Sequence, residues 1–298
     1  RYQTMSVDAK DNSLGTIAHL VKAEDTEQPV DRESFRAQSS GTNNDSSGIV
    51  PERVNIQSRL KQADMLIADG HLGPELSDEY RRIKRPLLSN AFGKSASLVD
   101  HGNLILVTSS VTGEGKTTTS LNLALSIAHE RDHTVLLVDC DVVKKGVSRM
   151  LGVSSRPGLI DVLEDDYFTV GDALLRTDVP ELSVLSAGKR HDYVTELLAS
   201  QRMSNLVEEM SSRYDDRVII FDAPPLLPTP QTQVLAGLVG QIVFVIEAGQ
   251  TPQSAVEDAL DMIRGDKPIG LVLNKSVGSC GRSGSYYGSY GSDDDKKK

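Results

Sequence analysis

The pattern of apolar and polar positions changes along the chain and separates its two ends from its middle. Residues 1–50 are rich in Ser, Asp, Glu, Asn, Thr and Gln, with few large apolar side chains and no sustained period. Such a segment buries too little apolar surface to offset its chain entropy, so we expect it to be disordered. Residues 51–75 carry scattered apolar positions, which indicate a linker with one short, weakly docked helix.

Residues 76–275 alternate between strand-like and helix-like patterns. Val, Ile and Leu runs predict strands at Leu104–Thr108, Val135–Asp139, Leu182–Leu185, Val218–Asp222, Ile242–Glu247 and Ile269–Asn274. A helical period predicts helices at Ser77–Phe92, with Ser77 as N-cap, and at Lys116–Glu130, Thr195–Ser211 and Gln253–Ile263. Apolar runs without polar alternation are typical of parallel strands covered on both faces. The pattern therefore predicts an α/β fold with a doubly wound, mainly parallel sheet and a ligand at the carboxyl ends of its strands.

Residues 276–298 are rich in Ser, Gly and Tyr and end in three aspartates and three lysines, which predicts a flexible tail. Three of the eight tyrosines, Tyr286, Tyr287 and Tyr290, lie within five residues of this tail. They are either chance aromatics of a low-complexity segment or acceptor hydroxyls presented by a compliant chain. The acidic run Asp293–Asp295 follows them closely.

Composition narrows the possible functions. The 298 residues carry a net charge of −10, which argues against broad binding of nucleic acid through its phosphates. No apolar run approaches the ~20 residues that span a bilayer, and the first residues lack the apolar core of a signal peptide. The two cysteines, Cys140 and Cys280, fit no metal-binding spacing, so we expect a reducing cytoplasm.

The clearest chemical signature lies between the first predicted strand of this region and the following helix. The apolar run stops at a loop of small residues, and a helical pattern begins at Lys116. A strand, such a loop and a helix are the context of a phosphate-binding P-loop, in which backbone N–H groups and the helix N-terminus face the phosphates. We predict that this loop binds a nucleoside triphosphate. The predicted binding residues are Ser110, Val111, Thr112, Gly113, Glu114, Gly115, Lys116, Thr117 and Thr118.

Within this loop, Lys116 would neutralise phosphate charge and the Thr117 hydroxyl would coordinate Mg²⁺. The first position of G-x-x-x-x-G-K-[ST] is Ser110 instead of glycine. We interpret this as a variant, because serine fits the position where the backbone angles are ordinary.

Two further predicted strands end in aspartate. Asp139 and Asp141 lie two residues apart, so both carboxylates could face the same Mg²⁺ or attacking hydroxyl. Asp222 precedes Ala-Pro-Pro at the Walker B position, where an aspartate holds Mg²⁺ directly or through water. A turn or helix cap is the alternative for one such aspartate, but two such strands after a P-loop favour catalysis. The predicted catalytic residues are Lys116, Asp139, Asp141 and Asp222, and the predicted metal ligands are Thr117, Asp141 and Asp222.

Together, the P-loop, the D-x-D strand and the D-A-P-P strand resemble the deviant-Walker ATPases that include MinD and ParA. Those positioning ATPases carry an extra lysine directly after the first loop residue, where this chain has Val111. A second branch fits better. Glu79, Arg82 and Arg85 form E-x-x-R-x-x-R on the helix before the P-loop, and this motif with the tail tyrosines is similar to the bacterial tyrosine kinase family, whose members act in capsule and exopolysaccharide synthesis.

This resemblance covers the chain from about residue 74 onward and implies a mechanism. ATP and Mg²⁺ would occupy the P-loop, and Asn274 would contact the base. Tyr286, Tyr287 and Tyr290 would be autophosphorylated in trans within a ring, a homo-oligomer that residues 76–92 join through Glu79, Arg82 and Arg85. Asp139 is the candidate proton acceptor, although the sequence does not separate its role from that of Asp141.

The resemblance also implies partners. A separate transmembrane activator, a polysaccharide co-polymerase, would hold the kinase at the inner face of the bacterial inner membrane, and a cognate tyrosine phosphatase would reverse the modification. One departure from the family is Val142-Val143-Lys144-Lys145-Gly146, where Leu-Arg-Arg-Pro is usual after D-x-D.

Three functional classes remain open from the sequence. A tyrosine autokinase requires the loop lysine and the tail tyrosines. A MinD/ParA-like positioning or assembly ATPase would hydrolyse ATP without labelling itself. A nucleotide-dependent scaffold would bind ATP and oligomerise without turnover.

Overall fold

The computed structural model describes residues 19–20, 53–63, 65, 74–93 and 99–276. The tyrosine tail predicted at 276–298 lies outside these residues except for Ser276, so the structure says nothing of Tyr286, Tyr287 and Tyr290. Of the predicted disordered segment 1–50, only His19–Leu20 is described. These two residues form strand β1.

In the described part of the chain, one sheet of nine strands runs in the order β1-β9-β8-β3-β7-β4-β6-β5-β2. Neighbouring strands are parallel except for the antiparallel pairs β1–β9 and β5–β6. The strands after β1 are β2 (Arg53–Val54), β3 (Leu104–Ser109), β4 (Thr134–Asp139), β5 (Leu175–Thr177), β6 (Leu182–Leu185), β7 (Arg217–Asp222), β8 (Gln241–Glu247) and β9 (Ile269–Asn274). The α/β fold with a mainly parallel sheet is thus confirmed.

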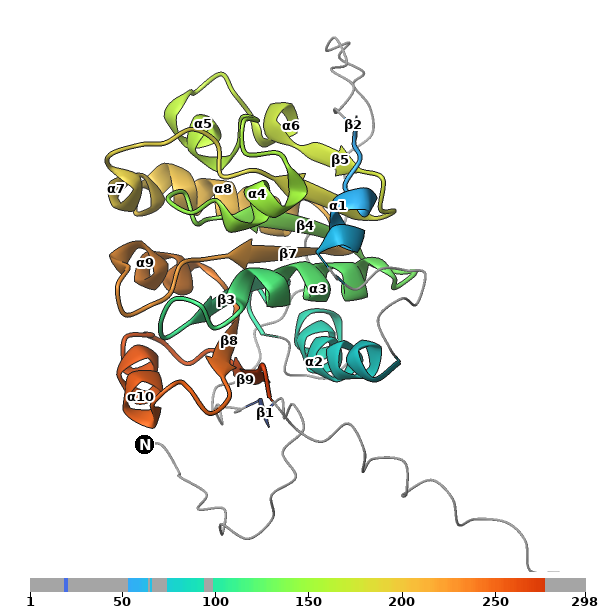
Figure 1. Cartoon of the computed structure of the whole chain (residues 1–298). Coiled ribbons are helices and arrows are strands. Elements are labelled where there is room, and N and C mark those ends of the chain that lie inside the picture. The colour runs from blue at the N-terminus through green and yellow to red at the C-terminus, as the bar shows by residue number, and fades with distance from the viewer. Residues whose placement is uncertain (1–18, 21–52, 64, 66–73, 94–98, 277–298) are drawn as a thin grey trace, which may run out of the picture.

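Helices cover both faces of the sheet, as a doubly wound fold requires (Figure 1). One face packs against α1 (Gln57–Gln62), α2 (Pro74–Phe92), α3 (Lys116–Ala128) and α4 (Gly146–Leu151). The helices over the other face are α5 (Leu159–Glu164), α6 (Val170–Ala173), α7 (Val194–Leu198), α8 (Gln201–Ser212), α9 (Pro230–Leu238) and α10 (Gln253–Asp261).

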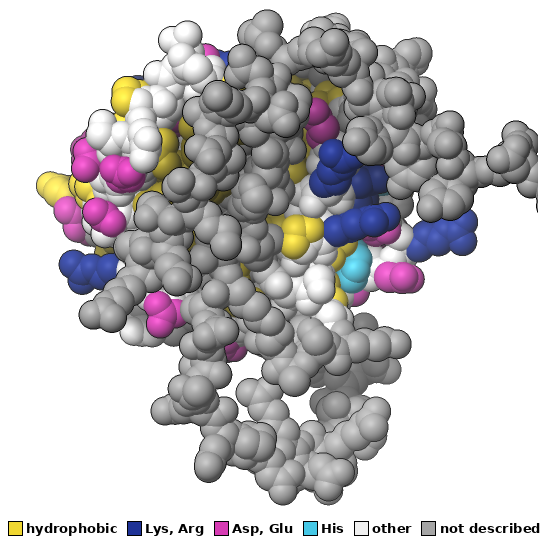
Figure 2. Space-filling model, turned by 90° about the horizontal axis from the view of Figure 1, so that it is seen from below, with side chains coloured by type: hydrophobic (Ala, Val, Ile, Leu, Met, Phe, Trp, Pro, Cys, Tyr) yellow, Lys and Arg dark blue, Asp and Glu magenta, His cyan; other side chains and the backbone are white. Residues whose placement is uncertain are grey.

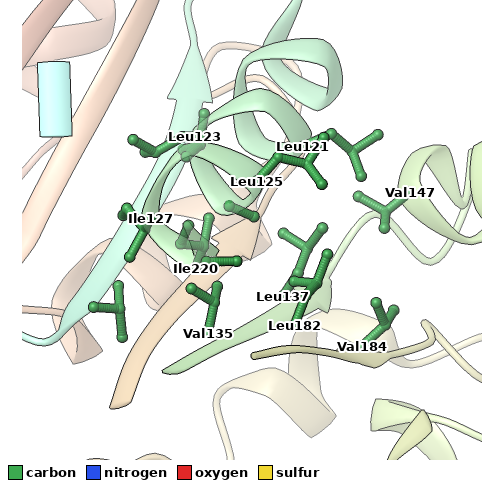
Figure 3. Close-up of a cluster of buried hydrophobic side chains, with 14 of the residues drawn as sticks. Leu121, Leu123, Leu125, Ile127, Val135, Leu137, Val147, Leu182, Val184 and Ile220 are labelled. Atoms are coloured by element: carbon green, nitrogen blue, oxygen red, sulfur yellow. The ribbon is translucent and has the colours of Figure 1, made fainter. Parts of the chain in front are cut away.

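The helix α3 is buried almost all the way round, because the sheet lies on one side of it and α2 on the other. A helix whose side chains are buried on nearly every side needs neighbouring elements on both sides. Figure 3 shows its leucines facing side chains of three parallel strands, which fixes the helix relative to the strand ends. The labelled side chains of α3 are Leu121, Leu123, Leu125 and Ile127, and those of β4, β6 and β7 are Val135, Leu137, Leu182, Val184 and Ile220.

Several predicted element boundaries are wrong. The helix α2 begins at Pro74, so Ser77 lies inside the helix and is not its N-cap; a proline fits the first helical position because it lacks the N–H that would remain unbonded there. The helix predicted at Thr195–Ser211 is two helices, because Ser200 is extended (φ −74°, ψ 155°) and its side chain accepts a hydrogen bond from the Met203 N–H.

The short helix α1 docks more tightly than predicted. Ile56, Leu60 and Met65 are buried in the same core cluster as the apolar side chains of α3. The carboxylate of Asp178 accepts hydrogen bonds from the Ile56 and Gln57 N–H groups at 2.8 and 3.2 Å, and so caps the start of the helix.

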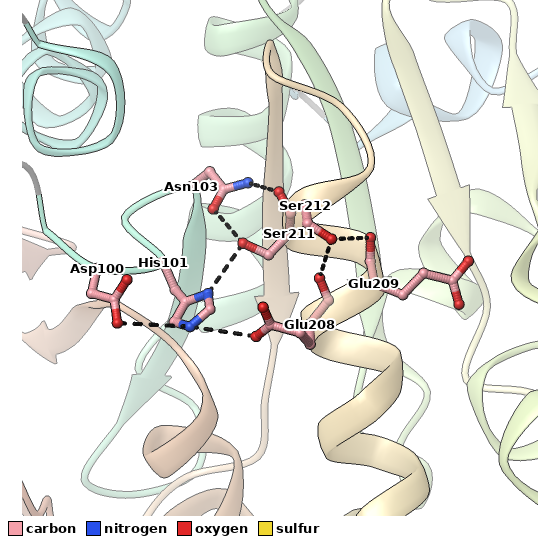
Figure 4. Close-up of polar contacts among 7 residues, drawn as sticks. All are labelled: Asp100, His101, Asn103, Glu208, Glu209, Ser211 and Ser212. Atoms are coloured by element: carbon pink, nitrogen blue, oxygen red, sulfur yellow. Dashed lines mark hydrogen bonds and ion pairs between the residues drawn. The ribbon is translucent and has the colours of Figure 1, made fainter. Parts of the chain in front are cut away.

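A polar network fixes the start of β3 against the end of α8 (Figure 4). Asn103 donates to the Ser211 carbonyl at 3.0 Å and accepts from the Ser211 hydroxyl at 2.9 Å. His101 contacts the same hydroxyl at 3.3 Å and the carboxylate of Glu208 at 3.5 Å. These contacts lie at the amino ends of the parallel strands, away from the loop that follows β3.

Candidate active site

The loop between β3 and α3 has the conformation of an anion-binding turn. Gly113 and Gly115 adopt φ angles of 99° and 98°, in the left-handed region that glycine tolerates best. Gly115 is the N-cap of α3 and has no side chain to bond the first N–H groups of the helix. Those N–H groups therefore remain available to an anion at the positive end of the helix.

Contacts from two neighbouring strand ends hold this loop in place. The Glu114 carboxylate accepts hydrogen bonds from the Val111 N–H at 2.7 Å and the Thr251 hydroxyl at 2.5 Å. The Asn274 side-chain amide donates to the Glu114 carbonyl at 2.8 Å, and a Cβ at Gly115 would lie 2.0 Å from that amide nitrogen. Asn274, which we predicted to contact a base, thus contacts the P-loop backbone itself.

Lys116 is the buried cation of the site, with 8% of its surface exposed. Burial lowers the pKa of its ammonium, while the carboxylates of Asp222, Asp141 and Glu114 oppose that shift. A partly desolvated ammonium beside carboxylates interacts more strongly with an arriving phosphate than an exposed lysine would.

Asp222 at the end of β7 joins the loop to the sheet. It accepts hydrogen bonds from the hydroxyls of Thr117 and Ser120, each at 2.8 Å. Parallel pairing places Asp222 directly beside Asp139 of β4. Burial, and next the charge of Asp139, raise the pKa of Asp222 to about 7.

The two carboxylates of the D-x-D strand lie in different surroundings. Asp139 is fully buried and accepts hydrogen bonds from the Ser148 N–H at 2.8 Å, the Ser148 hydroxyl at 2.6 Å and the Asp141 N–H at 3.1 Å. Burial raises its pKa to about 6 in spite of these donors. Asp141 is only partly buried and accepts from the Lys144 N–H at 2.8 Å. Asp141 is therefore the carboxylate of this pair that a molecule arriving from solvent can meet.

The remaining predicted site residues lie around this centre. Val111, Thr112 and Gly113 are exposed on the loop and Thr118 is exposed in the first turn of α3, whereas Ser110 is fully buried. The Ser110 hydroxyl has no hydrogen-bond partner among the described residues.

The predicted oligomerisation residues lie on α2, apart from the carboxylates predicted to be catalytic. Arg82 and Arg85 are exposed there, while Glu79 is half-buried. In Figure 1, α2 runs along the lower part of the molecule, and Figure 2 shows Lys and Arg side chains gathered on the described surface of that side.

Sequence reasoning missed three residues that shape the site. Ser120 and Ser148 donate to the two buried aspartates, and a Cβ at Gly146 would lie 2.6 Å from the Thr117 hydroxyl. Ser120 follows a run of polar residues at the start of α3, so it does not stand out in the sequence. Ser148 and Gly146 belong to a short helix without a recognisable period, so no sequence signal identifies them.

The donor set fits a magnesium ion bound together with a nucleotide. Among the described residues, no group of three or more His, Cys, Asp or Glu side chains could enclose a metal. Mg²⁺ needs no such cage, since it keeps waters and binds one or two carboxylates together with substrate phosphates. The Thr117 hydroxyl and the Asp222 carboxylate are oxygen ligands of this kind, and Asp141 lies nearby on β4's end.

Comparisons with known proteins give a consistent assignment. Residues 102–264 match the protein family described as an AAA domain. The putative tyrosine-protein kinase CapB of Staphylococcus aureus is 30% identical over 221 residues, which are 73% of this chain and 91% of that protein. The succinoglycan biosynthesis transport protein ExoP of Rhizobium meliloti is 32% identical over 184 residues, 58% of this chain and 22% of that protein.

A solved structure supports the same assignment. The kinase domain of VpsO is 31% identical and superposes with a TM-score of 0.54 over 66% of this chain and 99% of that domain. The fold, the P-loop and these relatives agree: the chain belongs to the bacterial tyrosine kinase family.

Proposed function

We propose that this chain is an ATP-dependent protein-tyrosine autokinase that phosphorylates Tyr286, Tyr287 and Tyr290 of a neighbouring copy. One observation carries the proposal: a P-loop with the buried cation Lys116 faces the register-paired aspartates Asp139 and Asp222. The bacterial tyrosine kinase family, to which the chain belongs, supports the same chemistry.

The P-loop residues would bind the phosphates of ATP. The first N–H groups of α3 and the Lys116 ammonium supply positive charge. The hydrogen bond from the Val111 N–H to the Glu114 carboxylate would hold the loop in its phosphate-binding conformation. Thr117, Asp222 and Asp141 would hold Mg²⁺. When bound, this ion would neutralise charge on the transferring phosphoryl group.

In the transfer step, a tyrosine hydroxyl oxygen forms a bond to the γ-phosphorus while the bond from that phosphorus to the bridging oxygen of ADP breaks. The hydroxyl proton passes to a carboxylate and then to solvent. Asp139 was the acceptor that the family resemblance implied, but its oxygens already accept bonds from Ser148 and Asp141. The exposure of Asp141 favours that residue as the group that meets the hydroxyl, with Asp139 positioning its backbone. Such a step depends mainly on positioning and charge.

The tail would reach the site of a neighbour in a ring held together by Glu79, Arg82 and Arg85 on α2. Each phosphate adds about −1.5 to −2 charges at pH 7. Three phosphates on one tail would repel the carboxylates of the site, so the modified tail leaves and the ring loosens. Cyclic assembly would then regulate capsule or exopolysaccharide synthesis and export, for which the name of the relative ExoP is the support.

The membrane association is also part of the proposal. Among the residues that the structure describes, no helix is long and apolar enough to cross a membrane. We propose that a separate transmembrane activator holds the kinase at the inner face of the bacterial inner membrane, and that a tyrosine phosphatase resets the tail.

The test is to incubate the purified protein with γ-labelled ATP and Mg²⁺ and to map phosphotyrosine by mass spectrometry, with and without the cytoplasmic tail of an activator. Label should appear on the tail and vanish in Lys116→Met and in the triple Tyr286/Tyr287/Tyr290→Phe variant. The matched control is Tyr167/Tyr193/Tyr214→Phe, because these tyrosines are exposed on the described surface. This control should keep its label. Released phosphate without any labelled protein would point to a positioning ATPase instead.

A further inference from the structure

A pocket of about 270 Å³ lies beside the catalytic carboxylates and is lined mainly by polar and basic side chains. It forms where the loop before α4, the loop before α5 and the loop after β6 meet. Its lining includes Lys145, Ser154, Ser155, Arg156, Asp161 and Lys189. None of these residues has a part in the nucleotide site described above.

The pocket is linked to the active site through the loop before α4. The Lys145 N–H donates to the Asp141 carbonyl at 2.6 Å, and the Lys145 ammonium donates to the Gly188 carbonyl in the pocket wall. The next residue, Gly146, contacts Thr117 so closely that a Cβ would lie 2.6 Å from the Thr117 hydroxyl. With 3.8 Å between successive Cα atoms, the Cα atom of Lys145 lies within roughly 8 Å of that hydroxyl.

The pocket carries an excess of positive charge. Lys145, Arg156 and Lys189 contribute three cations, and Asp161 is the acidic residue in the lining. The Asp161 carboxylate accepts hydrogen bonds from the Gly158 and Lys189 N–H groups at 2.9 and 3.2 Å, so it serves as the cap of α5.

The Lys189 ammonium has an acidic neighbour outside the pocket. Lys189 pairs with Glu164 at 2.5 Å, but this ion pair is half-exposed on the surface. Exposed pairs of this kind contribute little and exchange partners readily. An arriving carboxylate can therefore compete for the Lys189 ammonium.

The sequence holds a segment whose chemistry matches this pocket. Asp293–Asp295 begins three residues after Tyr290. An extended chain covers at most about 3.3–3.6 Å per residue, so three residues span roughly 10 Å. Because the Cα atom of Lys145 in the pocket wall lies within roughly 8 Å of the Thr117 hydroxyl, a chain of this length anchored in the pocket can reach the ATP site.

We propose that this basic pocket binds the acidic run Asp293–Asp295 of a neighbour's tail and thereby presents Tyr290 to the ATP site. The proposal rests on the proposed function and adds a specificity rule to it: the kinase selects tyrosines with carboxylates about three residues further along the chain. Tyr286 and Tyr287 lie six or more residues before the acidic run, so they would reach the site from the same anchor only with slack in the chain.

The test is direct binding, which needs no catalysis and therefore separates this proposal from the kinase activity. A fluorescent peptide of residues 285–295 is titrated with the full chain by anisotropy, at low and at physiological salt. The protein carries Asp293/Asp294/Asp295→Asn, so that its own tail does not compete. A second peptide with the same three asparagines reports the contribution of the carboxylates, and a third combines the asparagines with phosphorylated Tyr290.

We expect the acidic peptide to bind at least about fivefold more tightly than the asparagine peptide, and Arg156→Gln/Lys189→Gln to abolish that preference. The matched control is Arg131→Gln/Arg213→Gln, which removes two exposed arginines elsewhere and should keep it. Equal binding of the acidic and asparagine peptides, or an unchanged preference in the pocket variant, would overturn the proposal. Tighter binding of the phosphorylated asparagine peptide would overturn it too, because the pocket would then hold phosphotyrosine instead.

Melting temperature and ATP affinity report whether the pocket variant keeps its fold. Where tail phosphorylation is measurable, the pocket variant should raise the KM for the acidic peptide and leave kcat within about twofold. A lower kcat at constant KM would mean that Arg156 and Lys189 act on the catalytic loop and not on the tail.

Discussion

Asp139 and Asp222 are two carboxylates held side by side at the ends of β4 and β7, both out of contact with solvent. Burial raises the pKa of each, and the pKa of Asp222 is raised further by the charge of Asp139. Two negative charges in this position are unfavourable until a cation arrives. The two carboxylates are therefore partly protonated near neutral pH, and Mg²⁺ binding would favour their ionised forms.

This arrangement makes stability depend on pH in a defined direction. The pKa of Asp222 is about 7 in the folded protein against ~3.9 in an unfolded chain, so the folded state binds more protons between those values. Stability should fall as pH rises from about 4 to 7 and then level off. Asp222→Asn removes this cost and should raise the free energy of unfolding relative to the parent protein by on the order of 2 kcal/mol at pH 8.

The same substitution should be far less stabilising at pH 4, where Asp222 is protonated in the folded state and about half protonated in the unfolded chain. Urea denaturation without Mg²⁺ at both pH values measures the difference, with the exposed Asp215→Asn as the matched control. A stability gain that is equal at pH 4 and pH 8 would show that packing and not protonation is responsible.

Binding of the nucleotide with Mg²⁺ should depend on pH for the same reason. In the proposed metal site Asp222 must be ionised, so affinity should weaken as pH falls below about 7. Calorimetry in two buffers of different ionisation enthalpy should detect proton release on binding at pH 6.5. Proton release that persists undiminished at pH 8.5, or in Asp222→Asn, would contradict this account.

At the residue scale, the sequence predicted a P-loop and three aspartates that the structure places near one another, because strands that end in polar residues after a P-loop are visible as a pattern. It did not reveal that Asp139 is fully buried and Asp141 only partly buried, since the burial of Asp139 involves its contacts with Ser148. Ser148 lies on the short helix α4, which has too few residues to show a period in the sequence.

At the scale of elements, α2 is attached to α3 by buried polar contacts. The Tyr80 side chain hydrogen-bonds with Asn122 and Thr119, and burial raises its pKa. The Lys84 ammonium donates to the Ser126 carbonyl at 2.6 Å and pairs with Glu130 at 2.5 Å near the end of α3. The proposed ring-forming helix thus contacts the helix that begins at Lys116.

Lys84→Met should destabilise the protein by about 1–3 kcal/mol, because the Ser126 carbonyl and Glu130 lose a buried partner while the side-chain volume is kept. Arg81→Met is the matched control, since its ion pair with Asp78 is exposed, and it should change stability by less than about 0.5 kcal/mol. Chemical denaturation followed by circular dichroism measures both. An equal loss of stability in the two variants would show that the buried contacts of Lys84 stabilise the protein no more than the exposed ion pair of Arg81.

Long apolar elements were predicted well, and short or capped ones were not. The six predicted strands are present with ends shifted by at most one residue. The helices α4, α5, α6 and α9 and the strands β1, β2 and β5 were missed because short elements offer few positions for a period. The break between α7 and α8 depends on the conformation of one serine, Ser200.

At the scale of the whole molecule, the proposed cycle couples tail phosphorylation to assembly. The unphosphorylated protein should form a ring, and full phosphorylation should reduce its mass in solution. Light scattering after size-exclusion chromatography, before and after incubation with ATP and Mg²⁺, measures this change. The Arg82→Ala/Arg85→Ala variant should have a low mass in solution both before and after phosphorylation. If the parent protein has the same mass before and after full phosphorylation, the cycle is refuted.

The most direct test of the account mixes two variants that are each unable to label themselves. Lys116→Met keeps the tail tyrosines without a functional P-loop, and Tyr286/Tyr287/Tyr290→Phe keeps the P-loop without the tail acceptors. With γ-labelled ATP and Mg²⁺, the mixture should carry label on the tail of the Lys116→Met chain, while neither variant alone should be labelled there. If the mixture stays unlabelled under conditions in which the parent protein labels its tail, transfer between copies is ruled out.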